Sequence, residues 1–221
     1  INRLQTPPEI LDQLCTSLAW NTSPWIVGYG LIFRSPAQWW VPTRYEVPDG
    51  ARWIRDEEGG IDGSVAVALS APEIARIGVS HQPFLAVEPG RRFSFSVRYR
   101  TEDVQGDAPA VRITFVNERH RAPEGTPYEF FVRGEGGTHG WQELRIDDIV
   151  APEGAAVVNV ELFLWNASGT VWFDDVRFLR EGENIVRNPS FEMPAGEIDA
   201  DARDALVGGL KFLREHEDLY R

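Results

Sequence analysis

The stretch GTVWFDDVRF (residues 169–178) decides the fold of this chain. It predicts a turn followed by a strand in which two adjacent carboxylates interrupt an apolar run. Aspartate is poor in strands, so the pair needs an explanation. One carboxylate could leave the strand to hold a cation while its neighbour faces water. The alternative is a bulge at a sheet edge with both acids solvated.

The chain upstream of this stretch is β-like from Tyr45 onward. Apolar and polar side chains alternate over residues 93–99 and 111–115, and again over 157–165. In the last of these segments Val158, Val160, Leu162 and Leu164 point inward, which leaves Asn159, Glu161, Phe163 and Trp165 on the opposite face. At least seven such strands with no helix between them predict an all-β fold, an antiparallel β-sandwich.

Both ends of the chain carry helical patterns. Thr6-Pro7-Pro8-Glu9 is a capped helix start, and apolar residues follow at helical spacing up to Leu18. Residues 199–219 have a second amphipathic pattern, weakened by Gly208-Gly209. We therefore expect an N-terminal helix with an aromatic, Pro/Gly-rich extension (1–44), the sandwich (45–180), and a linker, a short strand and a C-terminal helix (181–221).

The composition restricts the functional class. A net charge of −12 disfavours binding to nucleic acid and to anionic membrane surfaces. Cys15 is the only cysteine, which excludes an internal disulfide and a cysteine zinc site. No stretch is apolar for long enough to span a bilayer. Because the chain begins at Ile1, we expect a processed product or a fragment.

Four motifs, in order along the chain, resemble one known family. They are IDGSVAVAL (61–69), VEPGRRFSFSV (87–97), GWQ (140–142) with APEGA (151–155), and the stretch 169–178. Together they resemble the β-jelly-roll carbohydrate-binding modules of bacterial polysaccharide-degrading enzymes, in the galactose-binding-domain-like superfamily. The resemblance implies a jelly roll that performs no catalysis and acts outside the cell, in the periplasm or on the cell surface.

One motif of that family is displaced. Its modules usually begin with an N-x-x-x-N-P-x-F-E strand, whose glutamate joins a structural calcium site with an acid of the closing strand. Here the motif is NIVRNPSFE (184–192), after the closing strand. Either it opens a second module, for which residues 193–221 are too few, or it folds back as a displaced edge strand.

The resemblance also implies which acids would bind calcium. Calcium takes about six to eight oxygen ligands. The predicted ligands are Asp175 or Asp174, with Asp62 in a glycine-rich turn and Glu192 as further candidates. The alternative is that these acids are simply solvated.

A sugar site needs exposed aromatic rings beside groups that hydrogen-bond hydroxyls. The strand face with Asn159, Glu161 and Trp165 meets this requirement, and Arg98 and Arg112 on neighbouring strands are predicted to line the same groove, where they would suit acidic sugars. The alternative is an ordinary solvent face, or one covered by the terminal helices.

The sequence therefore predicts a non-catalytic, exported module that binds polysaccharide by stacking and hydrogen bonding, with a structural calcium ion. The competing hypothesis is an assembly subunit that docks to protein partners through its terminal helices. Neither hypothesis includes catalytic residues, because the four histidines are far apart in the sequence and no nucleophile motif is present.

Overall fold

The computed structural model describes residue 37 and residues 39–194. Nine β-strands and one 3₁₀ turn account for the regular structure of this part. The elements are β1 (Trp40–Glu46), β2 (Arg52–Asp56), η2 (Ile61–Gly63), β3 (Ala66–His81), β4 (Leu85–Ala86), β5 (Arg92–Val116), β6 (Glu129–Arg133), β7 (Gly137–Val150), β8 (Val157–Arg180) and β9 (Glu183–Asn184). All strand pairs are antiparallel.

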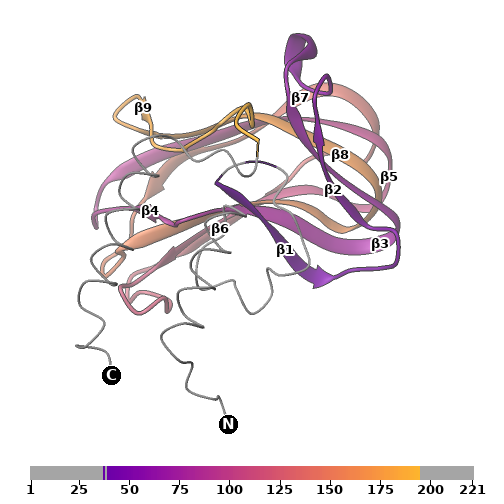
Figure 1. Cartoon of the computed structure of the whole chain (residues 1–221). Helices are drawn as coiled ribbons and strands as arrows, with labels where there is room; N and C mark the ends of the chain where they lie inside the picture. The colour runs from indigo at the N-terminus through magenta and orange to yellow at the C-terminus, as the bar shows by residue number, and fades with distance from the viewer. Residues whose placement is uncertain (1–36, 38, 195–221) are drawn as a thin grey trace, which may run out of the picture.

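The three long strands β3, β5 and β8 each contribute to two layers. In the first layer the order is β2-β3-β8-β5-β7, and in the second it is β1-β3-β8-β5-β6. The long strands curve at one end of the molecule, where they pass from one layer to the other (Figure 1). The antiparallel β-sandwich that the sequence predicted is therefore confirmed.

One hydrophobic core fills the space between the layers. The first layer contributes Phe95 and Phe173, and the second contributes Ile113 and Leu162, all of them fully buried. The predicted inward set Val158, Val160, Leu162 and Leu164 lies in this core. Period-two alternation explains the result, since successive strand residues point to opposite sides of a layer.

The sequence was wrong about where the long strands end. Residues 157–165 and 170–178 were predicted as two strands joined by a turn at Gly169, but β8 is continuous from Val157 to Arg180. Gly169 instead permits the bend. Its φ is +98°, and a Cβ atom there would lie 2.5 Å from the carbonyl oxygen of Asp103 on β5. The segments 93–99 and 111–115 likewise belong to the single strand β5.

The displaced motif folds back onto the sandwich. β9 pairs with β8, the Phe191 side chain is fully buried, and its ring lies 5.2 Å from that of Trp40. Asn188 contributes its carbonyl oxygen to the indole N–H of Trp40 at 3.0 Å. Of the two alternatives for residues 184–192, the structure favours the displaced edge segment. The helices predicted within 1–44 and 195–221 lie outside the described residues.

Candidate functional site

Four aromatic rings cluster on the outer surface of the second layer. They come from β1, β6 and β8: Tyr45, Phe131, Phe163 and Trp165. The Trp165 ring centroid lies 5.1 Å from Phe131, 5.2 Å from Phe163 and 6.3 Å from Tyr45. Tyr45 and Phe131 are exposed at 49% and 37%, whereas Phe163 is fully buried beneath its neighbours. We call this surface the aromatic face.

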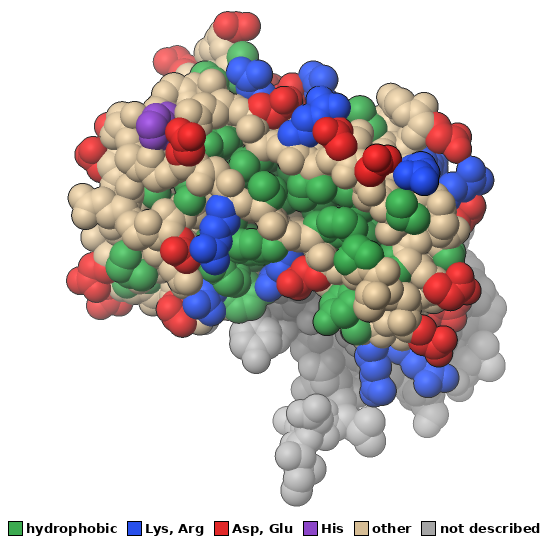
Figure 2. Space-filling model, turned by 180° about the vertical axis from the view of Figure 1, so that it is seen from behind, with side chains coloured by type: hydrophobic (Ala, Val, Ile, Leu, Met, Phe, Trp, Pro, Cys, Tyr) green, Lys and Arg blue, Asp and Glu red, His purple; other side chains and the backbone are tan. Residues whose placement is uncertain are grey.

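A glycine on the neighbouring strand makes room for the buried ring. Gly78 on β3 is paired with Phe163, and a Cβ atom at Gly78 would lie 2.5 Å from the Phe163 ring. The ring therefore lies directly against the backbone of β3. On the side of the molecule that Figure 2 shows, hydrophobic side chains gather near the middle, and most of the charged groups lie around them.

A buried ion pair lies at the centre of the aromatic face. Arg112 on β5 is paired with Glu161 on β8, and its Nε donates to Glu161 Oε2 at 2.8 Å. The Tyr45 hydroxyl donates to Glu161 Oε1 at 3.3 Å and also accepts a hydrogen bond from Arg112. Burial raises the pKa of Glu161, and the nearby Arg112 partly opposes that increase. The two charges of the ion pair cancel, so the pair has almost no net charge. Its hydrogen bonds to the hydroxyl hold the Tyr45 ring in place.

The other arginines of the aromatic face also have polar partners. Arg76 lies 4.5 Å from the Trp165 ring centroid and donates to Asn166 Oδ1 at 2.8 Å. Arg133 forms an ion pair with Asp107 at 3.5 Å. These contacts hold the guanidinium groups against the rings and neutralise part of the charge.

Of the predicted sugar-site residues, four lie on the aromatic face and one does not. Trp165, Glu161 and Arg112 are in contact, and Asn159 lies further along the same strand, where its Oδ1 accepts from Ser80 at 2.7 Å. Arg98 belongs to the first layer, where it is paired with Asp174 on β8 and Glu143 on β7. The two arginines share a strand, but β5 crosses from one layer to the other between them.

Sequence reasoning missed three residues of the aromatic face. Tyr45 stood at a predicted domain boundary, Phe131 lay in a segment predicted as a strand but was given no role in a site, and Arg76 lay in a segment with no assigned strand. Only the pairing of strands distant in sequence brings them to Trp165. The alternation around Phe131 was the one available signal.

Two of the four predicted calcium ligands point to the same loop. Asp174 Oδ2 accepts from the backbone N–H of Ile61 at 2.9 Å and from the Ser64 hydroxyl at 3.1 Å. Glu192 Oε1 accepts from the N–H of Val65 at 3.2 Å. Burial raises the pKa of Asp174. Both carboxylates therefore hold residues 61–65.

The other two predicted ligands lie apart from this loop contact. Asp175 forms an ion pair with Arg177 at 2.8 Å, and Asp62 is exposed. Within residues 39–194, no cluster of three or more histidine, cysteine, aspartate or glutamate side chains is suited to a metal. A calcium ion at Asp174 and Glu192 would thus need carbonyl oxygens from the loop to complete about six to eight ligands.

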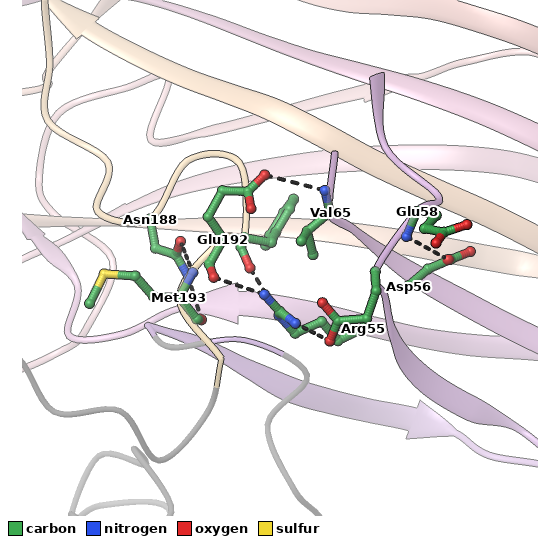
Figure 3. A network of polar contacts seen from close by, with 9 residues as sticks. Arg55, Asp56, Glu58, Val65, Asn188, Glu192 and Met193 are labelled. Atoms are coloured by element: carbon green, nitrogen blue, oxygen red, sulfur yellow. Dashed lines mark hydrogen bonds and ion pairs between the residues drawn. The ribbon is translucent and has the colours of Figure 1, made fainter. Parts of the chain in front are cut away.

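The displaced motif is what brings Glu192 to this place. Arg55 on β2 donates to the carbonyl oxygens of Phe191 and Glu192 at 3.2 and 2.8 Å. Asn188 and Met193 exchange two hydrogen bonds of 3.0 Å that close the loop between them. Figure 3 shows these contacts, with the Glu192 carboxylate turned toward Val65. The segment 183–193 therefore acts as a clasp on β2 and on the loop before β3.

An open cleft of about 530 Å³ lies among other loops. Its lining comprises Pro89, Asn117, Glu118, Arg119, Pro123, Glu124 and residues 154–156. No aromatic ring is among these lining residues, so the cleft lacks the stacking surface that the aromatic face provides. In the part of the chain that the structure describes, no helix is long and apolar enough to cross a membrane.

Comparison with known proteins supports the fold. No family profile and no curated protein matches the sequence. The enzymatically active domain of tailspike protein 4 from bacteriophage CBA120 is similar in structure, with a TM-score of 0.51 and 17% identity, over 73% of this chain and 23% of that one. The chain spans about a quarter of the length of this and the next solved structures it matches.

Carbohydrate-binding modules are among the similar structures. A xylan-binding domain of family 22 aligns with 71% of this chain and 93% of its own, at 15% identity and a TM-score of 0.45. A family 61 module in complex with β-1,4-galactotriose aligns with 64% and 88%, at 14% identity and a TM-score of 0.42.

Proposed function

We propose that the aromatic face binds a polysaccharide and that the chain is a non-catalytic binding module of an exported protein. The observation that carries the proposal is the cluster of Tyr45, Phe131 and Trp165 on one sheet surface, beside the polar groups of Arg112 and Glu161, with Asn159 further along the same strand. Sugar rings stack on such aromatic surfaces, and polar side chains between the rings orient the hydroxyls. The arrangement performs no bond-breaking step.

The charges of the face favour a neutral glycan. Arg112 is neutralised by Glu161, Arg133 by Asp107, and Arg76 is bonded to Asn166 and lies near Glu46. Each guanidinium already has a partner that an acidic sugar would have to displace. This reverses our expectation from the sequence that Arg112 would suit acidic sugars.

Affinity electrophoresis against neutral and acidic polysaccharides tests the proposal. We expect retardation on at least one neutral glycan, and its loss in Trp165→Ala, because stacking on Trp165 supplies the main contact. Trp141→Ala, which removes a partly exposed tryptophan from the first layer, is the matched control and should leave retardation on that neutral glycan unchanged. Retention of binding by Trp165→Ala, or no retardation of the folded wild-type protein on any neutral glycan, would contradict the proposal.

The alternative of an assembly subunit depends on helices outside the described residues and stays a prediction. Co-purification in a larger complex, together with no retardation on any glycan, would favour it over the binding module.

A further inference from the structure

A second surface with tryptophan and arginine lies on the outer side of the first layer. Arg98 and Arg100 of β5, Trp141 of β7 and Trp172 of β8 form it, and we call it the arginine face. The guanidinium carbon of Arg100 lies 3.8 Å from the Trp172 ring centroid and 5.8 Å from that of Trp141. Its Nε donates to the carbonyl oxygen of Gly59 at 3.3 Å. All three contacts of Arg100 are therefore with neutral groups.

Neither arginine of this face has an acidic partner in the described part of the chain. Within residues 39–194 no carboxylate lies at ion-pair distance from Arg98 or Arg100. The Nε of Arg98 is buried and has no hydrogen-bond partner there. Leaving a buried charged donor unsatisfied is costly, so such a group usually has a partner.

The acids nearest in register are occupied or turned outward. Asp174, paired with Arg98, gives its carboxylate to Ile61 and Ser64. Asp56 accepts the Trp172 indole N–H at 2.8 Å. Glu143, paired with Arg98 on the other side, is exposed to solvent and makes no ion pair with it. The face thus holds two arginines outside any ion pair among the described residues.

We propose that the arginine face binds the oxyanion of an acidic saccharide, either the carboxylate of a uronic acid or a sulfate ester. Arginine presents a planar set of donors that matches such oxyanions, and these charge-assisted bonds are among the strongest in proteins. Arg98 takes the oxyanion through the terminal nitrogens of its guanidinium group, because its Nε is buried beyond the reach of a ligand, and Trp141 takes the adjoining sugar ring by stacking. This site is separate from the aromatic face and does not depend on its function.

The test uses short saccharides, because the net negative charge repels long polyanions. Calorimetry measures binding of a uronic acid trisaccharide and of a sulfated trisaccharide to the whole chain, in low and in high salt. We expect one or both to bind, with affinity falling as salt rises. The stronger ligand identifies the oxyanion. Arg98→Gln should weaken binding about ten- to a hundred-fold, the loss of one hydrogen-bonded charge.

Three variants make the result specific. Arg92→Gln removes an equal charge from the exposed part of the same strand and should bind as the wild type does. Trp165→Ala, altered only on the aromatic face, should also bind normally. If Arg98→Gln proves poorly folded, Arg98→Lys takes its place as the test variant. It keeps the charge without the planar donors, so we expect it to bind more weakly than the wild type without losing binding. No binding of either trisaccharide by the folded wild type, or equal affinity of the Arg98 and Arg92 variants, would overturn the proposal.

Discussion

The two outer faces of the sandwich carry the same residue types but treat their arginines differently. In both, β5 places an arginine opposite an acid of β8: Arg112 opposite Glu161, and Arg98 opposite Asp174. On the aromatic face the pair closes into an ion pair at 2.8 Å. On the arginine face the acid accepts from the backbone N–H of Ile61 and the hydroxyl of Ser64 and forms no ion pair with its arginine.

The difference shows that strand register brings an arginine and an acid side by side, but does not ensure that they form an ion pair. Hydrogen-bond donors from a nearby loop can take the carboxylate instead. The loop before β3 supplies one backbone N–H and one serine hydroxyl, both of which donate to Asp174 Oδ2. Among the described residues, the hydrogen-bond partners of Glu161 are instead the Arg112 and Tyr45 side chains. Similar cross-strand pairs of an arginine with an acid therefore give an ion pair on one face and an arginine outside any ion pair on the other.

The largest expected effect concerns the stability that each arginine provides. Removing one partner of a buried ion pair leaves an uncompensated charge, at a cost of about 3–5 kcal/mol. Arg112→Met should therefore lower the free energy of unfolding by about 3 kcal/mol or more, since Glu161 is only 3% exposed. Arg98→Met removes an unsatisfied donor and should change it by less than about 1 kcal/mol. Urea denaturation measures both.

A double variant separates the ion pair from simple packing. Arg112→Met with Glu161→Gln removes both charges and should recover much of the stability lost in the single variant. Equal losses in Arg112→Met and Arg98→Met would show that the contrast between the two faces has no energetic basis.

The next effect concerns the clasp, the segment 183–193, which contacts β2 of the first layer and β1 of the second. Its Arg187 is hydrogen-bonded to His81 of β3. His81 is buried, its Nε2 accepts from the N–H of Arg187 at 3.1 Å, and its Nδ1 lies 3.1 Å from the carbonyl oxygen of Pro83. Burial lowers the pKa of His81 to about 4. The unfolded chain therefore binds a proton more readily below pH 6.5, so the stability that His81 contributes is complete above that pH and is lost as the pH falls toward 4.

Acid should therefore loosen the clasp. Between pH 7 and pH 4.5 the loss attributable to His81 is about 2–3 kcal/mol. His81→Gln keeps an acceptor but does not titrate, so the difference in pH dependence between variant and wild type isolates the contribution. Denaturation at several pH values measures it, and parallel curves for the two proteins would contradict it. If the faces share this support, acid should weaken binding at both by similar factors once the clasp opens.

Local pattern predicted the sandwich and half of the candidate site. The alternation in Val157–Trp165 was sufficient to place Trp165 and Glu161 outward and four aliphatic residues in the core, since a strand has period two. It was not sufficient to separate Arg98 from Arg112. Both point outward from β5, and only the crossing of that strand between layers divides them.

The hydrogen-bond partners of Asp174 and Glu192 also could not be predicted from the sequence. That Asp174 serves a loop, and that Glu192 reaches the same loop from beyond the closing strand, depends on contacts between segments 110 to 127 residues apart. The motif at 184–192 signalled a relation to the closing strand but not which side of the sandwich it would join. Long-range closure of this kind has no local pattern from which it follows.

Calcium is the smallest expected effect and bears on the arginine face alone. The sequence predicts an ion at Asp175 or Asp174, with Asp62 and Glu192 as further ligands, and this stays a prediction; of these four, Asp174 and Glu192 contact the same loop. A ligand that binds only the native state raises stability, by about 1.4 kcal/mol at a concentration ten times its dissociation constant. Thermal unfolding with added calcium, against a chelator, should show the higher midpoint with calcium.

The matched variants are neighbours in sequence. Asp174→Asn should abolish the calcium shift, and Asp175→Asn, whose carboxylate pairs with Arg177, should retain it. Because Asp174 is paired with Arg98, a bound cation would also add positive charge beside the arginine face. The chelator should then weaken binding of an acidic trisaccharide there and leave neutral glycan binding at Trp165 unchanged. Equal midpoints of thermal unfolding with and without calcium would contradict the prediction that calcium binds. The loop of residues 61–65 would then be held by the two carboxylates alone.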